Sequence, residues 1–148
     1  MATNYLTDYG KADIAAGNCG TAAVLKLMLV TSAYTPSRTD QFVSAASAAE
    51  ISTTNYTGGY GGGGRKVIAS LAVTTDTTNH RAYLSNSPTV FAALGTSGGP
   101  QTAYCLLIRE TGGSDATSIL VGVWDCVNDC FGLDLTFTPA ATGTVLLN

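Results

Sequence analysis

The sequence predicts an all-β fold, an antiparallel β-sandwich of the jelly-roll or immunoglobulin-like kind with a short N-terminal helix and a long glycine-rich loop. Short segments with the two-residue hydrophobic alternation of half-buried strands follow one another along the chain. Turn-forming residues separate them and no helical period intervenes, which favours an antiparallel sheet. The 148 residues suit a single domain over 1–148.

The segment 1–20 is expected to form an N-terminal helix or arm. Residues 4–16 contain no proline and carry apolar residues at helical spacing. Asn4 would cap this helix, and Gly17 would follow its end.

The clearest strand is the apolar run Leu25–Val30. Three leucines lie on one face, and Lys26, Met28 and Val30 lie on the other. A strand that is only partly polar on its second face is expected in the middle of a sheet. Pro36 ends this part of the sheet, because proline cannot donate a ladder hydrogen bond.

Seven strands are predicted in all: residues 25–31, 66–74, 80–85, 102–110, 118–125, 133–138 and 144–147. Hydrophobic alternation in the predicted strands 66–74 and 133–138 indicates that each has one buried face. These faces consist of Val67, Ala69, Leu71 and Val73, and of Leu133, Leu135 and Phe137. Turn signals at 75–79, 111–115 and 139–143 connect the later strands.

The segment 37–64 differs from the rest of the chain. It is rich in Ser, Ala, Thr and Gly, has no sustained hydrophobic period, and ends in a run of glycines from Gly58 to Gly64. Long loops inside compact domains are usually functional. We expect this one to form an extended arm that contacts a partner.

The composition limits the choice of partners. Charged residues make up 11% of the chain and the net charge is −3, so copies repel one another weakly, which suits a protein that packs against neighbours. A small secreted domain with a neutral surface would have the same composition. The seven Lys and Arg are scattered, so no nucleic-acid partner is expected. No membrane association is expected, because no apolar run approaches roughly 20 residues, and no secretory signal is visible.

No catalytic, cofactor or metal site is predicted, and we expect the protein not to be an enzyme. The glycine run has the spacing of a phosphate-binding fingerprint, but Arg65 and Lys66 lead from it into a strand instead of a helix. His80 is the only histidine and has no nucleophile motif to serve. The ten carboxylates are scattered, although a glycosidase pair among them would be invisible in the sequence.

The segment 125–130, Asp-Cys-Val-Asn-Asp-Cys, is the most polar short stretch. Its Cys-x3-Cys spacing matches no standard zinc site, and its carboxylates depart from the calcium-loop order. A plain turn is the first interpretation, and a disulfide between Cys126 and Cys130 is the alternative. Cys105 is predicted to be a core residue.

Five tyrosines are candidate residues of an interface with a partner or another subunit. Tyr34, Tyr56 and Tyr60 fall in predicted loops, and Tyr5 and Tyr9 lie in the N-terminal segment. Their amphipathic rings are common in protein interfaces. Alternatively, they cap the ends of the sandwich within their own subunit.

Several features follow one another in a characteristic order. They are a helix that ends in Ala-Ala-Gly at 15–17, the strand Leu25–Val30, the turn 31–36, Phe42, the segment 49–59, and Ile-Arg-Glu-Thr-Gly at 108–112. In this order they resemble small structural proteins of tailed bacteriophages, which are encoded among head genes and described as capsid decoration, cement or head-fibre proteins. The glycine run up to Gly64 and the 126–130 segment depart from the pattern.

The resemblance implies a non-enzymatic virion component that is made in the host cytoplasm and located on the capsid surface. Its partners would be the major capsid protein and copies of itself, as a trimer or dimer. The segments 1–20 and 37–64 are the expected contact regions. A tail, neck or receptor-binding component is the first alternative, and a carbohydrate-binding module is the second.

Overall fold

The computed structural model describes residues 4–79, 81–129, 131–138 and 145–147, and antiparallel strands dominate it. The predicted all-β class with a short N-terminal helix is confirmed. The elements in chain order are β1 (Tyr5–Leu6), α1 (Asp8–Ala15), β2 (Leu25–Val30), α2 (Ser44–Ser47), β3 (Lys66–Val67), β4 (Ala72–Asp76), β5 (Arg81–Ser85), β6 (Thr89–Gly95), β7 (Gln101–Arg109), β8 (Ile119–Asp129), β9 (Phe131–Phe137) and β10 (Val145–Leu147).

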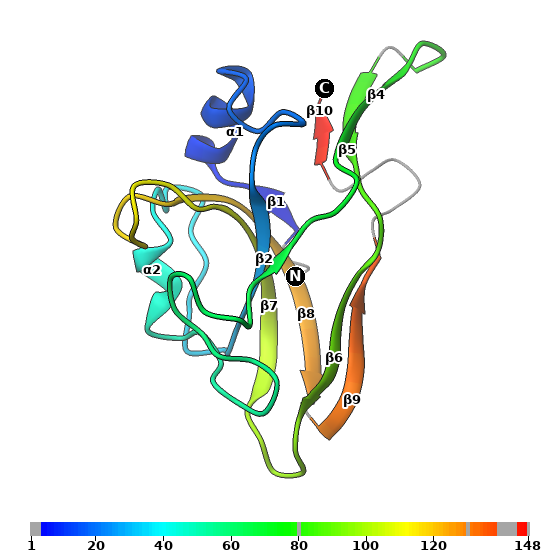
Figure 1. Ribbon diagram of the computed structural model, residues 1–148. Coiled ribbons are helices and arrows are strands. Elements are labelled where there is room, and N and C mark those ends of the chain that lie inside the picture. The colour runs from blue at the N-terminus through cyan, green and yellow to red at the C-terminus, as the bar shows by residue number, and fades with distance from the viewer. Residues whose placement is uncertain (1–3, 80, 130, 139–144, 148) are drawn as a thin grey trace.

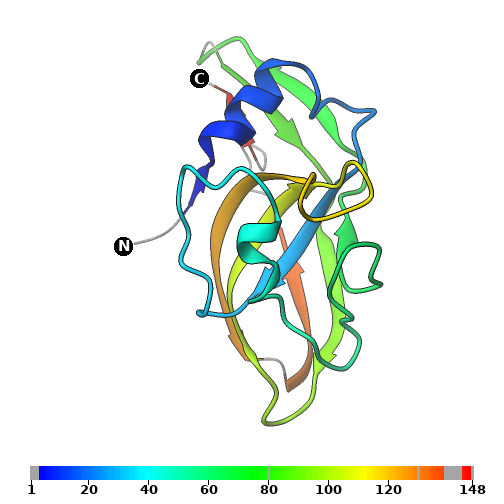
Figure 2. The same ribbon diagram turned by 90° about the vertical axis from the view of Figure 1, so that its left-hand side faces the viewer.

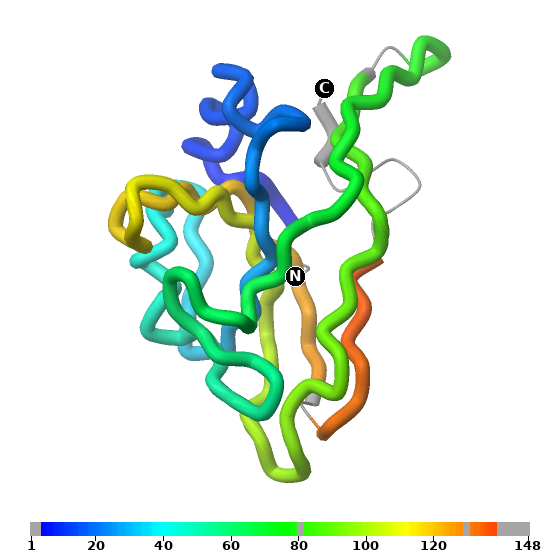
Figure 3. Tube along the Cα trace, in the orientation of Figure 1, coloured from blue at the N-terminus to red at the C-terminus, as the bar shows by residue number. Residues whose placement is uncertain are grey.

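The strands form three sheets that are arranged as a sandwich (Figures 1 and 2). The large sheet has the order β1-β8-β7-β2-β3, and the β6-β9 pair lies against it. The third sheet, β10-β5-β4, lies at the end of the molecule where the β4–β5 hairpin projects (Figure 3).

β2 lies inside the large sheet, as its sequence predicts. All six of its residues pair with β7 on one side, and Lys26 and Leu27 pair with β3 on the other. Its three leucines are at most 1% exposed. They point into the layer between the large sheet and the strands β5, β6 and β9, together with Leu84, Phe91, Leu94, Cys105, Leu107 and Val121.

The opposite face of the large sheet is buried as well. Met28, Val30, Leu106, Ile108, Leu120 and Val123 form a second core with Tyr34, Val43, Ala46 and Ala49 from the segment that follows β2. Figure 2 shows this segment and α2 lying across the sheet. The segment 37–64 therefore packs on the sandwich as a covering layer: residues 43–49 cover this face, and Ile51 and Tyr56 enter the first core. The expectation of an extended arm is corrected, because a sheet this apolar on both faces needs a cover on each.

The predicted strand 66–74 is two strands. The chain bends between β3 and β4, where Ser70 has a φ of 57°. Ile68 is buried, whereas Val67 and Val73 are 55% and 54% exposed, so the predicted buried face of this segment is wrong. The reversal precedes the bend, because Ile68 is buried while its neighbours Val67 and Ala69 are exposed.

β6 has no counterpart in the sequence prediction, because a β-bulge interrupts its alternation. Its pairing with β9 shifts between Phe91 and Leu94, and Ala93 has a φ of 45°. Two side chains hold the bulge: Asn55 Nδ2 donates to the Ala93 carbonyl at 2.9 Å, and the Ala93 N–H donates to Asp134 Oδ1 at 2.7 Å. An interrupted alternation leaves no strand signal.

The end of β8 also differs from the prediction. Residues 125–129 continue the strand, and Asp129 pairs with Gln101 of β7, so the plain turn predicted at 125–130 is wrong over its described part. In β9, Leu133 is 71% exposed, whereas Leu135 and Phe137 are partly buried, so the predicted face is buried only in part. The predicted turn at 139–143 lies outside the described residues.

α1 begins later than predicted. Thr7 is its cap and accepts a hydrogen bond from the Gly10 N–H at 2.8 Å, while Asn4 accepts one from the Asp125 N–H in β8 at 3.0 Å. Gly17 follows the helix with a φ of 79°, in agreement with the prediction. Because β1 pairs with β8, the N-terminal segment is part of the sandwich from residue 5 onward.

The contact between α1 and β8 requires a glycine at position 10. A Cβ atom there would lie 2.1 Å from the carbonyl oxygen of Val121. Alanine is preferred over glycine in a helix by about 1 kcal/mol, yet we expect Gly10→Ala to lower the free energy of unfolding by roughly 1–3 kcal/mol, because the backbone must move.

Urea unfolding measures this effect. Gly63→Ala is the control, because nothing lies within 4 Å of its Cβ position. A Gly10→Ala variant as stable as the parent would contradict the close contact.

Candidate functional site

Two of the predicted interface tyrosines are internal. Tyr34 is 5% exposed and Tyr56 is 1% exposed. The Tyr34 hydroxyl donates to Asp40 at 2.6 Å; that of Tyr56 donates to Glu50 at 2.9 Å and accepts from the Leu29 N–H at 3.0 Å. Both rings attach the covering layer to the sandwich of their own subunit. Their prediction as partner contacts is therefore corrected.

The other three tyrosines reach the surface at separate places. Tyr9 on α1 is 44% exposed and Tyr60 in the glycine-rich loop is 42% exposed. Tyr5 in β1 is partly buried beneath Arg38, whose guanidinium carbon lies 4.6 Å from the ring centroid. No aromatic contact joins any two of these rings within the described residues. Their part in an interface stays a prediction.

Large apolar side chains are exposed where β8 leads into β9. Val127 is 72% exposed, Phe131 51% and Leu133 71%. We call these three residues the β8–β9 surface. Single exposed apolar residues are common, but several in one short stretch of the chain are candidates for an interaction site.

The strand β9, beside the β8–β9 surface, has an open edge, because it pairs with β6 alone among the described strands. The outer edge of β8 is covered from Ile119 to Asp125 by residues 41–42, Thr7, β1 and Asn4 in turn. Unpaired strand edges offer backbone donors and acceptors to another chain. Phe131 and Leu133 thus lie on a strand with an open edge.

A cluster of charged side chains that the sequence did not reveal lies in the interior. The guanidinium of Arg65 is fully buried and bonds to three carboxylates: Glu50 at 2.7 Å, Asp115 at 2.7 Å and Glu110 at 3.1 Å. Lys26 forms a further ion pair with Glu110 at 2.5 Å. We call these five residues the Arg65 cluster.

The Arg65 cluster joins segments that are far apart in the sequence. Glu50 belongs to the covering layer, Glu110 follows β7, and Asp115 lies in the loop before β8. Burial lowers the pKa of Arg65, but its hydrogen bonds to Glu50 and Asp115 outweigh this and raise the pKa overall. The arginine therefore stays charged.

The glycine-rich loop serves the same cluster. The Gly59 N–H donates to Glu50 at 2.7 Å, so this backbone donor binds a carboxylate of the protein. Gly64 lies beneath the Tyr56 ring, where a Cβ would meet a ring carbon at 2.6 Å. Arg65 and Lys66 lead into β3, as predicted, and the loop thus lacks the following helix of a phosphate site.

A second internal ion pair holds α1. Asp13 accepts two hydrogen bonds from Arg109, at 2.5 and 2.6 Å, and one from the Cys19 thiol at 3.3 Å. Cys105 is fully buried in the core, as predicted. Cys126 is partly buried, and Cys130 lies outside the described residues, so the predicted disulfide between them stays a prediction.

The described part of the chain contains no group of three or more His, Cys, Asp or Glu side chains that could hold a metal ion. No helix in it is long and apolar enough to cross a membrane. His80 lies outside the described residues.

Comparison with protein-family models, curated proteins and solved structures finds no match for this chain. What the chain does is therefore inferred from its own residues and surfaces.

Removal of Arg65 tests the role of the cluster. Arg65→Met would leave three buried carboxylates without their main cation, and we expect a loss of about 3–5 kcal/mol of unfolding free energy. The Arg65→Lys variant should lose less unfolding free energy but remain less stable than the parent, because an ammonium group cannot bridge two carboxylates in one plane as a guanidinium does.

Denaturant unfolding gives the values, with Lys11→Met as the control. Lys11 pairs with Asp8 on the exposed face of α1, where both side chains are more than half exposed, so its loss should cost under about 0.5 kcal/mol. Equal effects of Arg65→Met and Lys11→Met would contradict the assigned role.

The Cys19 thiol provides a test by chemical reactivity. Burial and the hydrogen bond to Asp13 raise its pKa to about 12, so the thiol stays protonated at pH 8 and should react with a disulfide reagent far more slowly than in the unfolded chain. Above pH 9 the thiol ionises in the unfolded chain but not in the folded protein. The free energy of unfolding therefore falls as the pH rises from 9 towards 12. Mass spectrometry after brief labelling assigns the site, and rapid labelling of Cys19 in the folded protein would contradict the assignment.

Proposed function

We propose that the protein is a structural component of a tailed-phage virion, a decoration or cement protein that binds the outer capsid lattice and stabilises it. The resemblance of the segments around Leu25–Val30 and 49–59 to such proteins supports this proposal. The β8–β9 surface carries it: three large exposed apolar side chains, two of them on the open-edged strand β9, are suited to contact with another protein.

The proposed mechanism is mechanical. Each copy would contact the major capsid protein and neighbouring copies, as a dimer or trimer, so that capsid subunits separate less readily. Individual contacts can be weak, because a lattice that fixes their geometry makes their free energies add. The two covered faces of the large sheet supply the rigidity that such a bridge needs.

Localisation tests the function directly. Electron cryo-microscopy maps of particles assembled with and without the protein should differ on the outer face of the head, and particles without it should rupture at lower temperature. Difference density on the tail or neck would favour the first alternative and overturn the decoration proposal.

Substitutions on the β8–β9 surface test the contact. Because both side chains are more than half exposed, Phe131→Ser with Leu133→Ser should leave unfolding within about 0.5 kcal/mol of the parent and lower occupancy on purified particles at least about tenfold. Val73→Ser, at a valine 54% exposed on β4, is the matched control. Full occupancy of the double variant, measured by quantitative mass spectrometry of particles, would rule out this surface.

A further inference from the structure

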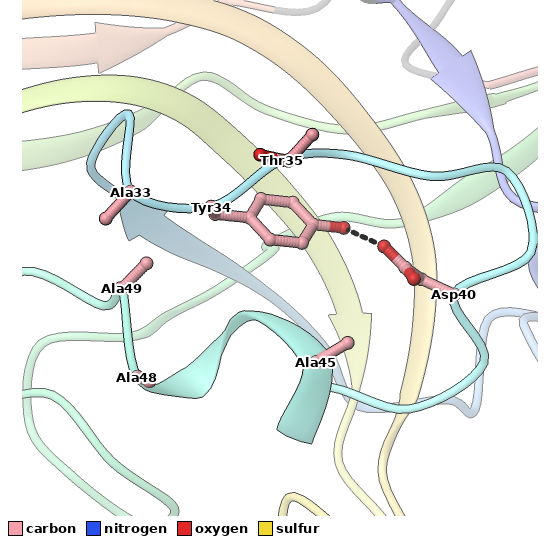
Figure 4. Close-up of a pocket in the computed structure, with 7 residues that line it drawn as sticks. All are labelled: Ala33, Tyr34, Thr35, Asp40, Ala45, Ala48 and Ala49. Atoms are coloured by element: carbon pink, nitrogen blue, oxygen red, sulfur yellow. Dashed lines mark hydrogen bonds between the residues drawn. The ribbon is translucent and has the colours of Figure 1, made fainter.

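An open hollow lies between the turn after β2 and the helix α2, away from the β8–β9 surface. Its volume is about 310 Å³, within the range of small-ligand pockets. Its lining consists of Ala33, Tyr34, Thr35, Asp40, Ala45, Ala48 and Ala49 (Figure 4).

Four of the seven residues that line the hollow are alanines, and polar atoms form nearly as much of its wall as apolar ones. Figure 4 shows Ala45, Ala48 and Ala49 on one side of the Tyr34 ring and Thr35 on the other. Ala33, Ala45 and Ala48 are exposed, so their methyl groups are open to solvent. Short side chains here leave a space that an aliphatic chain can fill.

One carboxylate is positioned at the edge of this space. Asp40 Oδ2 accepts hydrogen bonds from the Tyr34 hydroxyl at 2.6 Å and from the Ser37 N–H at 3.1 Å. These two bonds fix the orientation of the carboxylate. Oδ1 accepts no hydrogen bond from the described residues.

The charge of Asp40 is not neutralised by an ion pair among the described residues. Arg38, the nearest cation in the sequence, lies over the Tyr5 ring. Burial and the bond to Asp40 raise the pKa of Tyr34, so its hydroxyl remains a donor to Asp40. The carboxylate thus presents one open oxygen beside the alanine methyl groups.

We propose that this hollow binds a primary alkylammonium group, the chemistry found at the end of a lysine side chain. The aliphatic part would contact the alanine methyl groups, and the ammonium would donate to Oδ1 of Asp40. An anionic ligand would meet the uncompensated carboxylate, and a neutral one would gain only the apolar contact.

Titration of the ¹⁵N-labelled chain with n-butylammonium chloride at constant ionic strength tests the proposal. Saturable shifts of the Ala33, Ala45, Ala48 and Ala49 amides are expected with a dissociation constant on the order of millimolar, given the small size of the probe. Sodium butyrate, which has the same chain length and the opposite charge, should produce none.

Two variants assign the contacts. Asp40→Asn keeps an acceptor for Tyr34 and should weaken binding at least about tenfold, because the charge is lost. Ala45→Met should block the hollow. Asp8→Asn removes the same charge from the exposed face of α1 and should leave binding unchanged.

A second arm distinguishes the sources of the ammonium group. Nα-acetyl-lysine N-methylamide imitates a lysine within a protein, and binding of this probe as well as n-butylammonium would identify protein lysines as possible occupants. Binding of n-butylammonium alone would limit the site to free amines. The proposal is overturned if neither probe gives saturable shifts in the hollow, or if Asp40→Asn binds as tightly as the parent. This result is independent of where the protein sits in a virion.

Discussion

The large sheet is apolar on both faces, and the rest of the structure depends on this constraint. The leucines of β2 face the strands β5, β6 and β9, while Met28 and Val30 face the segment that carries α2. Each face needs its own cover, since exposed apolar sheet would be costly in water. A two-layer sandwich with a third, irregular layer is the outcome.

The irregular layer is held by polar contacts as much as by packing. Tyr56 bonds to the backbone of β2 and to Glu50, and Glu50 in turn binds Arg65. Buried charges are strongly stabilised only when every partner is present, so the Arg65 cluster fixes one position of the layer. Because α2 is the only helix among the described residues of this layer, such specific bonds define the conformation of the rest.

The fold class, the inner position of Leu25–Val30 and the end of α1 at Gly17 could be predicted, because alternation and glycine placement are local signals. β6 could not, since its bulge breaks the alternation. The buried face of 66–74 was assigned to the wrong side, since Ile68 is buried and Val67 is exposed.

The partners of Arg65 could not be predicted either, because they lie 15 to 50 residues away in the sequence. A usable signal was the rarity of charge: in a chain with 11% charged residues, an arginine directly before a strand was a candidate for an internal role. Tyr34 and Tyr56 were assigned to the surface because they stand in loops, and the loops proved to be a core layer.

The internal ion pairs leave the outside of the molecule unusually poor in charge. Arg65, Lys26 and Arg109 are three of the seven basic residues, and Asp13, Glu50, Glu110 and Asp115 are four of the ten acidic ones. Only the ionic side chains outside these pairs contribute to the long-range electrostatic field of the molecule. Copies can therefore be crowded into a dense layer with little electrostatic work, and short-range shape, not charge pattern, would set their spacing.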